Sequence, residues 1–93
     1  RFGGEEFLLI MPETQTEQAF IACERIRKLI ATTPIEPITS ITISGGIATN
    51  KHSNTISELL RQSDLALYQA KDQGRNRCIV WSPSLDSSKR PAD

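Results

Sequence analysis

A strand, a helix and a second strand are predicted by the sequence of residues 41–81, which reads ITISGGIATNKHSNTISELLRQSDLALYQAKDQGRNRCIVW. Its first part alternates isoleucine with polar residues, as a half-buried strand does, and Gly45-Gly46 is a candidate bulge in that strand. A capping box that begins at Thr55 then opens a helix, for which Gly74 is a natural C-terminal stop. The apolar run of residues 78–81 reads as a second strand. Strands that alternate with helices indicate an α/β sandwich in which helices pack on a sheet.

One more strand and one more helix are predicted before this unit. The apolar run of residues 7–11 lies between a glycine pair and Pro12, which suits a strand buried on both faces. Thr14 and Glu17 have the spacing of a capping box, and apolar residues then recur at helical spacing up to about Thr32. The predicted order of elements is therefore β-α-β-α-β.

A single domain is the most that 93 residues can hold, and the core of such a short chain is small. We expect residues 1–81 to be part of that domain, and residues 82–93, which are polar and contain prolines and serines, to be a disordered tail. The chain begins at Arg1, without a methionine and directly before a glycine pair that reads as a turn. We therefore expect it to be a piece of a longer protein.

Charge and composition exclude several classes of partner. Lys and Arg number 11, as do Asp and Glu, so the formal charge is zero and no broad field attracts a nucleic acid. No apolar run is long enough to cross a bilayer, which predicts a soluble protein and no membrane contact by this segment. Cys23 and Cys78 lack the paired spacing of a metal site or a disulfide framework, so we expect two buried free thiols in a reducing compartment.

Two adjacent carboxylates follow the first glycine pair. The stretch Gly3-Gly4-Glu5-Glu6 places them at a tight turn, where glycine lets the backbone approach a ligand. Mg²⁺ takes oxygen ligands and is usually held by one or two carboxylates together with substrate phosphates, so the pair suits a divalent cation. Taken alone, the commoner explanation is a glycine hairpin with two solvated acids.

A pair of cations lies near the end of the second predicted helix. Lys71 and Arg75 are four residues apart, so a helix would project them on one face, where they could clamp a phosphate. The alternative is that cations near a helix C-terminus are favoured by the helix dipole without any ligand. Asn76 follows the helix stop, where a polar side chain often satisfies free backbone groups.

Three stretches, read in order, resemble the GGDEF family. Residues 1–7 resemble its signature in the GGEEF form, residues 41–48 its Ser-x-Gly-Ile-Ala strand, and residues 64–77 its Asp-x-Ala-Leu-Tyr-x-Ala-Lys-x-x-Gly-Arg-Asn helix. The departures are small: Ser63 replaces the usual alanine, and Gly46 takes a variable place. The resemblance runs from Arg1 to about Val80.

The resemblance implies a fold and an activity. The fold is a partial palm-type, ferredoxin-like nucleotide-cyclase fold, whose first strand and preceding segment are not in this chain. The activity is that of a diguanylate cyclase, in which two GTP molecules on two facing domains of a homodimer condense into cyclic di-GMP, with Mg²⁺ or Mn²⁺ as cofactor. The resemblance further implies an upstream sensory or receiver domain and a cytoplasmic location, either of the whole protein or of the cytoplasmic part of a membrane-anchored one.

The same resemblance implies roles for individual residues. Glu5 is a metal ligand, and Glu6 is a second acid near the metal and the attacking hydroxyl. Gly3-Gly4 lets the backbone approach the nucleotide, and Lys71 and Arg75 hold its terminal phosphates. These roles fit phosphoryl transfer, which depends on positioning the nucleophile and neutralising phosphate charge.

Two further implications of the resemblance stay open. Arg25, on the first predicted helix, matches a position that joins an inhibitory product-binding contact in some members, and an exposed helix arginine is an equally good explanation. The domain is alternatively a non-catalytic module that binds GTP or cyclic di-GMP for regulation or dimerisation. In either case we expect the isolated chain to be inactive, because the first-strand metal aspartate and the guanine-recognising side chains of the family are not in it.

Overall fold

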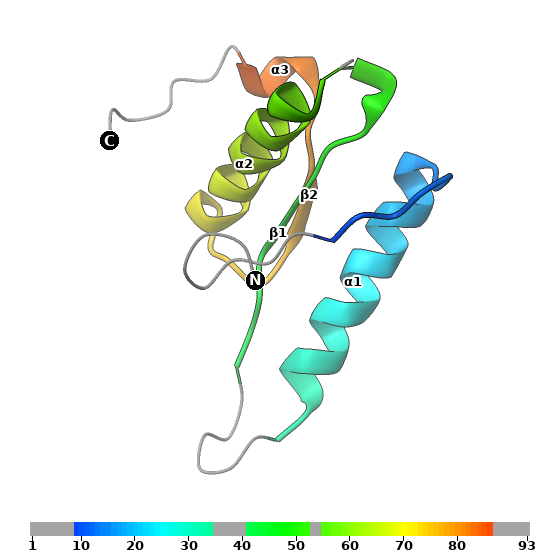
Figure 1. The fold of residues 1–93 in the computed structure, drawn as a ribbon. Helices are drawn as coiled ribbons and strands as arrows, with labels where there is room; N and C mark the ends of the chain where they lie inside the picture. Colours follow the sequence, from blue (N-terminus) through cyan, green and yellow to red (C-terminus); the bar gives the residue numbers. More distant parts are fainter. Residues whose placement is uncertain (1–8, 35–40, 53–54, 87–93) are drawn as a thin grey trace.

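The computed structural model describes residues 9–34, 41–52 and 55–86 (Figure 1). The elements in chain order are α1 (Thr16–Thr32), β1 (Gly45–Ile47), the 3₁₀ turn η1 (Asn50–His52), α2 (Ile56–Asp72), β2 (Cys78–Val80) and α3 (Pro83–Asp86). The α/β class predicted from the sequence is confirmed. In these described ranges, no helix is long and apolar enough to span a membrane.

The two strands form a parallel pair joined by α2. Gly46 lies opposite Ile79 in the register, and the residues on either side are paired in step. The ladder continues past both ends of β2, since Gly45 N–H donates to the Arg77 carbonyl (2.9 Å) and Trp81 N–H to the Ile47 carbonyl (2.7 Å). A parallel pair needs a crossover connection, and a helix is the usual one.

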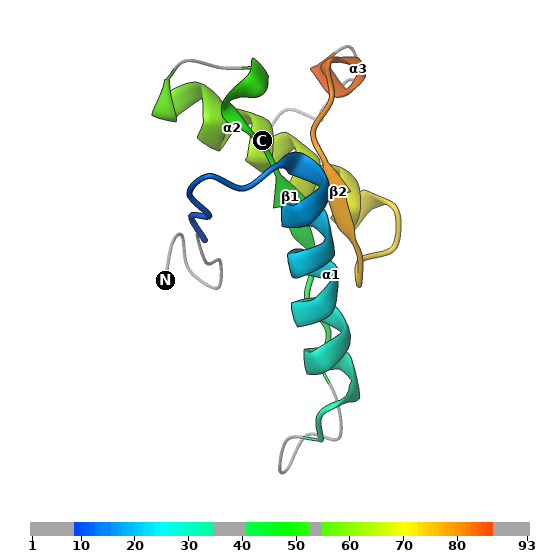
Figure 2. The ribbon, with the colours of Figure 1, turned by 90° about the vertical axis from the view of Figure 1, so that its right-hand side faces the viewer.

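The helices α1 and α2 cover opposite faces of this sheet (Figures 1 and 2). The glycine pair of β1 permits both contacts, because successive strand residues point to opposite faces. A Cβ on Gly45 would lie 2.6 Å from the Cys23 sulfur on α1, and a Cβ on Gly46 would overlap the backbone of Ser63 and Leu67 on α2. The prediction of a bulge at Gly45-Gly46 is therefore wrong: the register is continuous, and the glycines serve close packing.

Small apolar side chains fill the two layers. Between α1 and the sheet, Ala19, Ile47 and Cys78 are buried together, with Met11 and Val80 packed against them. On the other side, Ala66 and Ala70 of α2 are fully buried, and so is nearly all of Gln62; the Trp81 ring is also buried. Alanine on the contact face lets α2 approach the strands closely, which matches the absence of a side chain at Gly46.

Both long helices end close to where the sequence predicted. The predicted end of α1 at Thr32 is confirmed, but α1 begins at Thr16 with Gln15 as N-cap, so the expected capping box is displaced by one residue. The reason lies in Thr14, whose hydroxyl donates to the Pro12 carbonyl (2.9 Å), while Gln15 N–H donates to Gln18 Oε1 (3.4 Å). The cap predicted at Thr55 is confirmed by a hydrogen bond from Glu58 N–H to its hydroxyl oxygen (3.1 Å).

The predicted strands are longer than the observed ones. Of the strand expected over residues 7–11, the first two residues lie outside the described part, and residues 9–11 are not a strand; Leu9 and Ile10 are 60% and 75% exposed. The strand expected from Ile41 begins only at Gly45. An apolar or alternating run favours a strand, but the ladder also requires a neighbouring strand in register.

The first part of the stretch 82–93, predicted as a disordered tail, contains a helical turn. The helical turn α3 follows directly after the Trp81–Ser82 connection, and Leu85 N–H donates to the Ser82 carbonyl (2.9 Å). Residues 87–93 lie outside the described part of the chain.

The cysteines form a disulfide, which corrects the prediction of two free thiols. Cys23 on α1 and Cys78 at the start of β2 are separated by 55 residues in the sequence, and their Cα atoms are 6.5 Å apart. This Cα–Cα distance is within the range of disulfides. The sequence spacing gave no sign of the pairing, because it arises only when α1 packs across the sheet.

Candidate functional site

The predicted site residues fall into two groups. Gly3, Gly4, Glu5 and Glu6 lie outside the described residues, whereas Arg25, Lys71 and Arg75 lie within them. In the described ranges, no group of three or more His, Cys, Asp or Glu side chains is gathered as a metal site. The geometry that the structure supplies is therefore that of the cations.

The end of α2 fixes the backbone between Lys71 and Arg75. Gly74 N–H donates to the Lys71 carbonyl (3.3 Å), and Arg75 N–H donates to the Ala70 carbonyl (2.9 Å). These two bonds, with Gly74 at φ 116°, make a Schellman motif that closes the helix. The prediction that helical spacing puts Lys71 and Arg75 on one face is wrong, because α2 ends at Asp72 and Arg75 lies beyond it.

The turn after α2 has an unusual backbone. Gly74, Arg75 and Asn76 have φ values of 116°, 64° and 50°, so three consecutive residues lie at positive φ. Glycine adopts such angles freely and asparagine tolerates them, but a left-handed arginine costs roughly 1–2 kcal/mol. Residues held in this way often belong to functional sites, where surrounding contacts maintain the strain.

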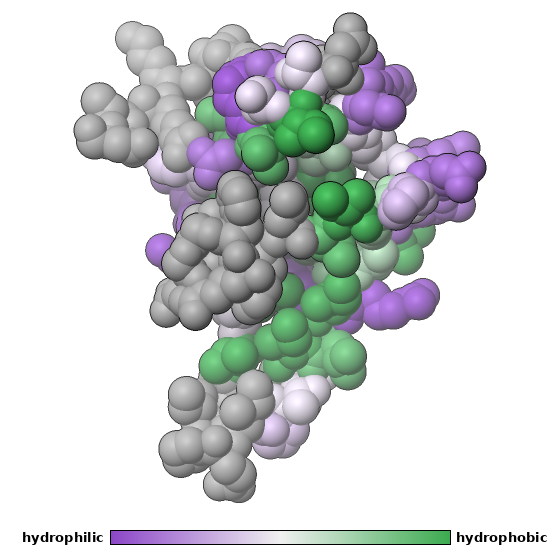
Figure 3. All heavy atoms as spheres, in the orientation of Figure 1, coloured by the Kyte–Doolittle hydropathy of each residue, from purple (hydrophilic) through white to green (hydrophobic). Residues whose placement is uncertain are grey.

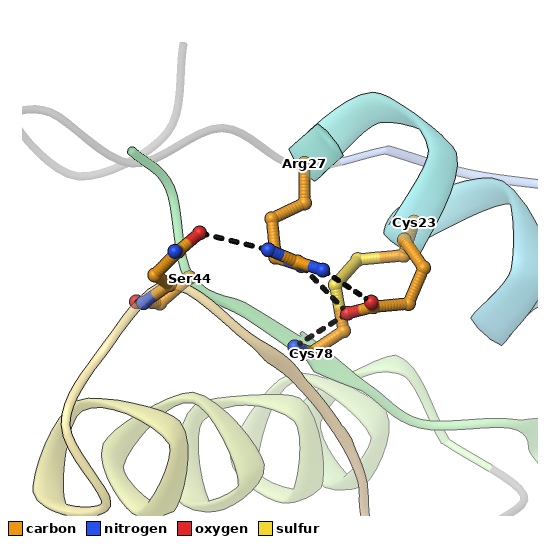
Figure 4. The surroundings of a disulfide bond; sticks show 6 residues. Cys23, Arg27, Ser44 and Cys78 are labelled. Atoms are coloured by element: carbon orange, nitrogen blue, oxygen red, sulfur yellow. Dashed lines mark hydrogen bonds and ion pairs between the residues drawn. A yellow bond between two sulfur atoms is a disulfide. The ribbon is translucent and has the colours of Figure 1, made fainter. Parts of the chain in front are cut away.

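Contacts from two other elements hold this turn. Asn76 N–H donates to the Ser44 hydroxyl oxygen (3.1 Å) just before β1, and Arg27 Nη1 of α1 donates to the Asn76 side-chain oxygen (2.9 Å). Figure 4 shows the Arg27 side chain reaching from α1 toward this contact. Asn76 thus joins distant elements, whereas the sequence led us to expect a local cap of the helix end.

Glu24 and Arg27 form a bidentate ion pair on α1 beside the turn. Arg27 Nη2 lies 2.7 Å from Glu24 Oε1, and Arg27 Nε donates to Oε2 (2.9 Å). The same Oε2 accepts the backbone N–H of Cys78 (3.1 Å), so the carboxylate bridges α1 and β2. The Arg27 and Glu24 side chains are only 15% and 20% exposed.

The ion pair also sets the ionisation of its two members. Hydrogen bonds from Arg27 hold the pKa of the Glu24 carboxyl below its ordinary value of 4.5, and the Cys78 N–H acts in the same direction, although partial burial opposes both. The carboxylate in turn raises the pKa of Arg27. Glu24 is therefore ionised at neutral pH.

Exposed cations surround the turn. Lys71, Arg75 and Arg77 are all exposed, and Arg77 Nε donates to the Arg75 carbonyl (3.1 Å). Lys71 lies in the last turn of α2, so the helix dipole favours its charge. Arg25 lies exposed on α1. An arginine fork at Arg75 and a lysine point charge at the end of α2 are chemically suited to a phosphate.

Sequence reasoning missed three residues of this site: Glu24, Arg27 and Ser44. The spacing of Glu24 and Arg27, three apart on a helix, is a signal for an ion pair. No local signal reveals their contacts with Asn76 and Cys78, which lie 49 and 54 residues away from them in the sequence.

These observations define an α/β domain in which the crossover helix delivers a cationic turn to the N-terminal end of two parallel strands. A sequence model described as "Diguanylate cyclase, GGDEF domain" matches residues 1–77. The chain belongs to the GGDEF family.

Similar proteins include curated diguanylate cyclases. The chain is 40% identical over 80 residues to the diguanylate cyclase DgcM of Escherichia coli and 39% identical over 85 residues to the response regulator PleD of Caulobacter vibrioides, covering 86% and 85% of this chain. These alignments cover 20% and 19% of the relatives' own lengths, so the chain spans about a fifth of each.

A solved structure shares the fold. The active GGEEF domain of a diguanylate cyclase from Vibrio cholerae superimposes with a TM-score of 0.81 at 39% identity, over 88% of this chain and 54% of that one. The chain therefore spans about half of that structure.

Proposed function

We propose that the protein carrying this chain is a diguanylate cyclase. The proposal rests on one observation: the chain keeps the unbroken sequence Gly3-Gly4-Glu5-Glu6-Phe7, and it is 39% identical to a structure described as the active GGEEF domain of a diguanylate cyclase. Degenerate acids would have favoured a module without activity. The reaction class agrees with the cationic turn, since its substrate is a nucleoside triphosphate.

The reaction joins two GTP molecules. The 3′-hydroxyl of each attacks the α-phosphorus of the other, so two phosphodiester bonds form, two phosphoanhydride bonds break, and two pyrophosphates leave. Such a reaction depends mainly on positioning and on neutralising phosphate charge. Each of two facing domains holds one GTP, so we propose a homodimer as the active species.

Different residues of this chain bind the metal ion and the nucleotide in the proposed reaction. Glu5 and Glu6 would supply carboxylate oxygens, the hard ligands that suit Mg²⁺ or Mn²⁺, with Glu6 as the second acid beside the attacking hydroxyl. When bound, the cation neutralises phosphate charge and orients the reacting groups. Gly3-Gly4 leaves room for the nucleotide, and Lys71 and Arg75 bind its terminal phosphates, with Arg75 placed by the Schellman turn.

The setting follows from the substrate and from the relatives. We place the domain in the cytoplasm, where GTP is available, and we propose an upstream sensory or receiver domain as its regulator. The similarity to a protein named as a response regulator supports the second point. Arg25, exposed on α1, is retained as a candidate for binding the product from a neighbouring domain.

The test is a comparison of the full-length protein with its Glu5→Ala, Glu6→Ala variant. Incubated with GTP and Mg²⁺ and analysed by nucleotide chromatography, the natural protein is expected to accumulate cyclic di-GMP. Loss of both acids is expected to lower that rate by at least about a hundredfold. Glu17→Ala, which removes an exposed acid in the first turn of α1, is the control and should keep full activity.

Two results would contradict the cyclase. Product formation by the double variant would show that these acids do not carry the reaction. No product from the natural protein, with GTP or cyclic di-GMP still bound, would favour the non-catalytic regulatory module.

A further inference from the structure

The 74–76 turn needs support from outside its own sequence. The Schellman bonds fix its start, and Gly74 accepts its φ without strain. Arg75 has no such freedom. Its local support is its own N–H bond to the Ala70 carbonyl and the bond from Arg77 Nε to its carbonyl. The contacts of Asn76 with Arg27 and Ser44 add support for this backbone from outside the turn.

Two elements supply those contacts: Ser44 before β1 accepts the Asn76 N–H, and the Glu24–Arg27 ion pair lies on α1. Arg27 donates to Asn76 at the end of the turn, and Glu24 accepts from both Arg27 and the backbone of Cys78, two residues further on. Figure 4 shows these bonds beside the Cys23–Cys78 disulfide, which attaches the same helical turn to the same strand residue. One turn of α1 thus contacts Asn76 and Cys78, the residues on either side of Arg77.

Arg27 itself is badly placed to bind a ligand. All three of its guanidinium nitrogens donate to Glu24 or Asn76, and only 15% of the side chain is exposed. Its charge is also balanced by the Glu24 carboxylate. Lys71 and Arg75, by contrast, are exposed. The arrangement separates two tasks, since one arginine shapes the turn and the other meets the ligand.

We propose that Glu24 and Arg27 are positioning residues, which hold the 74–76 turn in the conformation that lets Arg75 bind the terminal phosphates of GTP. The proposal rests on the proposed function for the identity of the ligand. It assigns a role in nucleotide binding to a helix that carries none of the signature motifs.

The test is a double-mutant cycle in the full-length protein with Arg27→Ala and Arg75→Ala. If Arg27 acts through Arg75, Arg27→Ala raises the KM for GTP roughly tenfold or more, because an Arg75 side chain that is moved out of position binds the phosphates less well. In the Arg75→Ala background, Arg27→Ala should then add little further loss. The GTP affinity of each protein, measured by calorimetry, gives the same cycle without turnover.

Matched controls separate positioning from general stability. Glu58 and Arg61 form an ion pair with the same spacing on α2, so Arg61→Ala breaks an equivalent pair away from the turn and should leave the KM unchanged. Asn76→Gly deletes the side-chain oxygen that Arg27 contacts but keeps the positive φ accessible. It leaves the Glu24–Arg27 pair intact, so it tests the proposal even if Arg27→Ala folds poorly, and it should raise the KM as Arg27→Ala does.

The outcomes are distinct. Additive effects of Arg27→Ala and Arg75→Ala, or an unchanged KM in Asn76→Gly, would overturn the positioning role and leave the cyclase standing. A natural protein that binds GTP without making product would overturn the cyclase, and the binding cycle would still decide the positioning role. A natural protein that neither binds nor converts GTP would refute both.

Discussion

Glu24 receives hydrogen bonds from two parts of the chain that are far apart in sequence. Two nitrogens of Arg27 donate to it within α1, and the Cys78 N–H donates to it from β2. Three donors on one carboxylate favour its ionised form, which is why its pKa is lowered. Its contribution to folding must therefore depend on pH.

The first prediction at this scale concerns Glu24→Gln. The folded-state pKa lies below the ordinary value of 4.5, so the carboxylate stabilises the fold fully above that pH and loses its effect as pH falls through the folded-state pKa. Natural protein should be more stable than Glu24→Gln at pH 7, and the difference should shrink on acidification below about 4.5. Urea unfolding at a series of pH values measures it; a constant difference would contradict the role of the charge.

Gly46 supports a second residue-scale prediction. A Cβ at this position would overlap the backbone of α2 at Ser63 and Leu67, and a helix backbone cannot rotate out of the way as a side chain can. We expect Gly46→Ala to lower the free energy of unfolding by about 2 kcal/mol or more, as overpacking does. Thermal or urea unfolding followed by circular dichroism would show this loss.

Gly45→Ala is the matched comparison. Its Cβ would meet the sulfur of Cys23, which is a side-chain atom. In reduced protein that side chain can turn to another rotamer, so Gly45→Ala should cost less than Gly46→Ala under reducing conditions. Equal losses would show that α2 does not pack as closely on β1 as the structure indicates.

At the scale of elements, the long helices could be predicted because their signals are local. The N-terminus of α2 follows from a single hydroxyl at Thr55, and its C-terminus from the one glycine that completes the Schellman motif. The same glycine explains why the prediction that Lys71 and Arg75 share a helical face is wrong. A helical spacing was assumed across Gly74, although glycine at that point ends the helix and the stop signal overrides the spacing.

The strands could be predicted only in outline, because their hydrogen bonds join distant residues. No local signal near Ile41 indicates that the pairing of β1 with β2 starts only at Gly45, opposite Cys78. The same limit applies to the site. The sequence pattern predicts Lys71 and Arg75 as candidates, whereas the contacts of Ser44 and Arg27 with Asn76 exist only after β1 and α1 have packed around the turn.

The disulfide belongs to the same class of long-range contact. The helix α1 reaches β2 only across the sheet, and Gly45 leaves the space that the two sulfurs occupy. The structure holds the pair as a disulfide, and its reduction would leave two thiols packed against each other. The Glu24 bond to Cys78 N–H fixes α1 to β2 in either state.

Across the described residues, several large apolar side chains are exposed to solvent. Figure 3 shows hydrophobic atoms gathered over much of one face, and Leu29, Ile21 and Ile10 are among the large apolar side chains that are more than half exposed. Exposed apolar patches of this kind mark surfaces that contact other protein. This chain spans 54% of the solved GGEEF domain that it resembles.

This difference in extent leads to the last prediction. The 93-residue chain, purified alone and supplied with GTP and Mg²⁺, should accumulate no cyclic di-GMP, although it contains both signature acids and the two cations proposed to bind phosphate. The metal aspartate and the guanine-recognising side chains implied by the resemblance are not among its residues, and half a metal site binds a cation weakly. The exposed apolar face should also bind a hydrophobic dye such as ANS more strongly than the full-length protein does. Cyclic di-GMP made by the chain alone would mean that these 93 residues complete an active site by themselves, which would contradict this prediction.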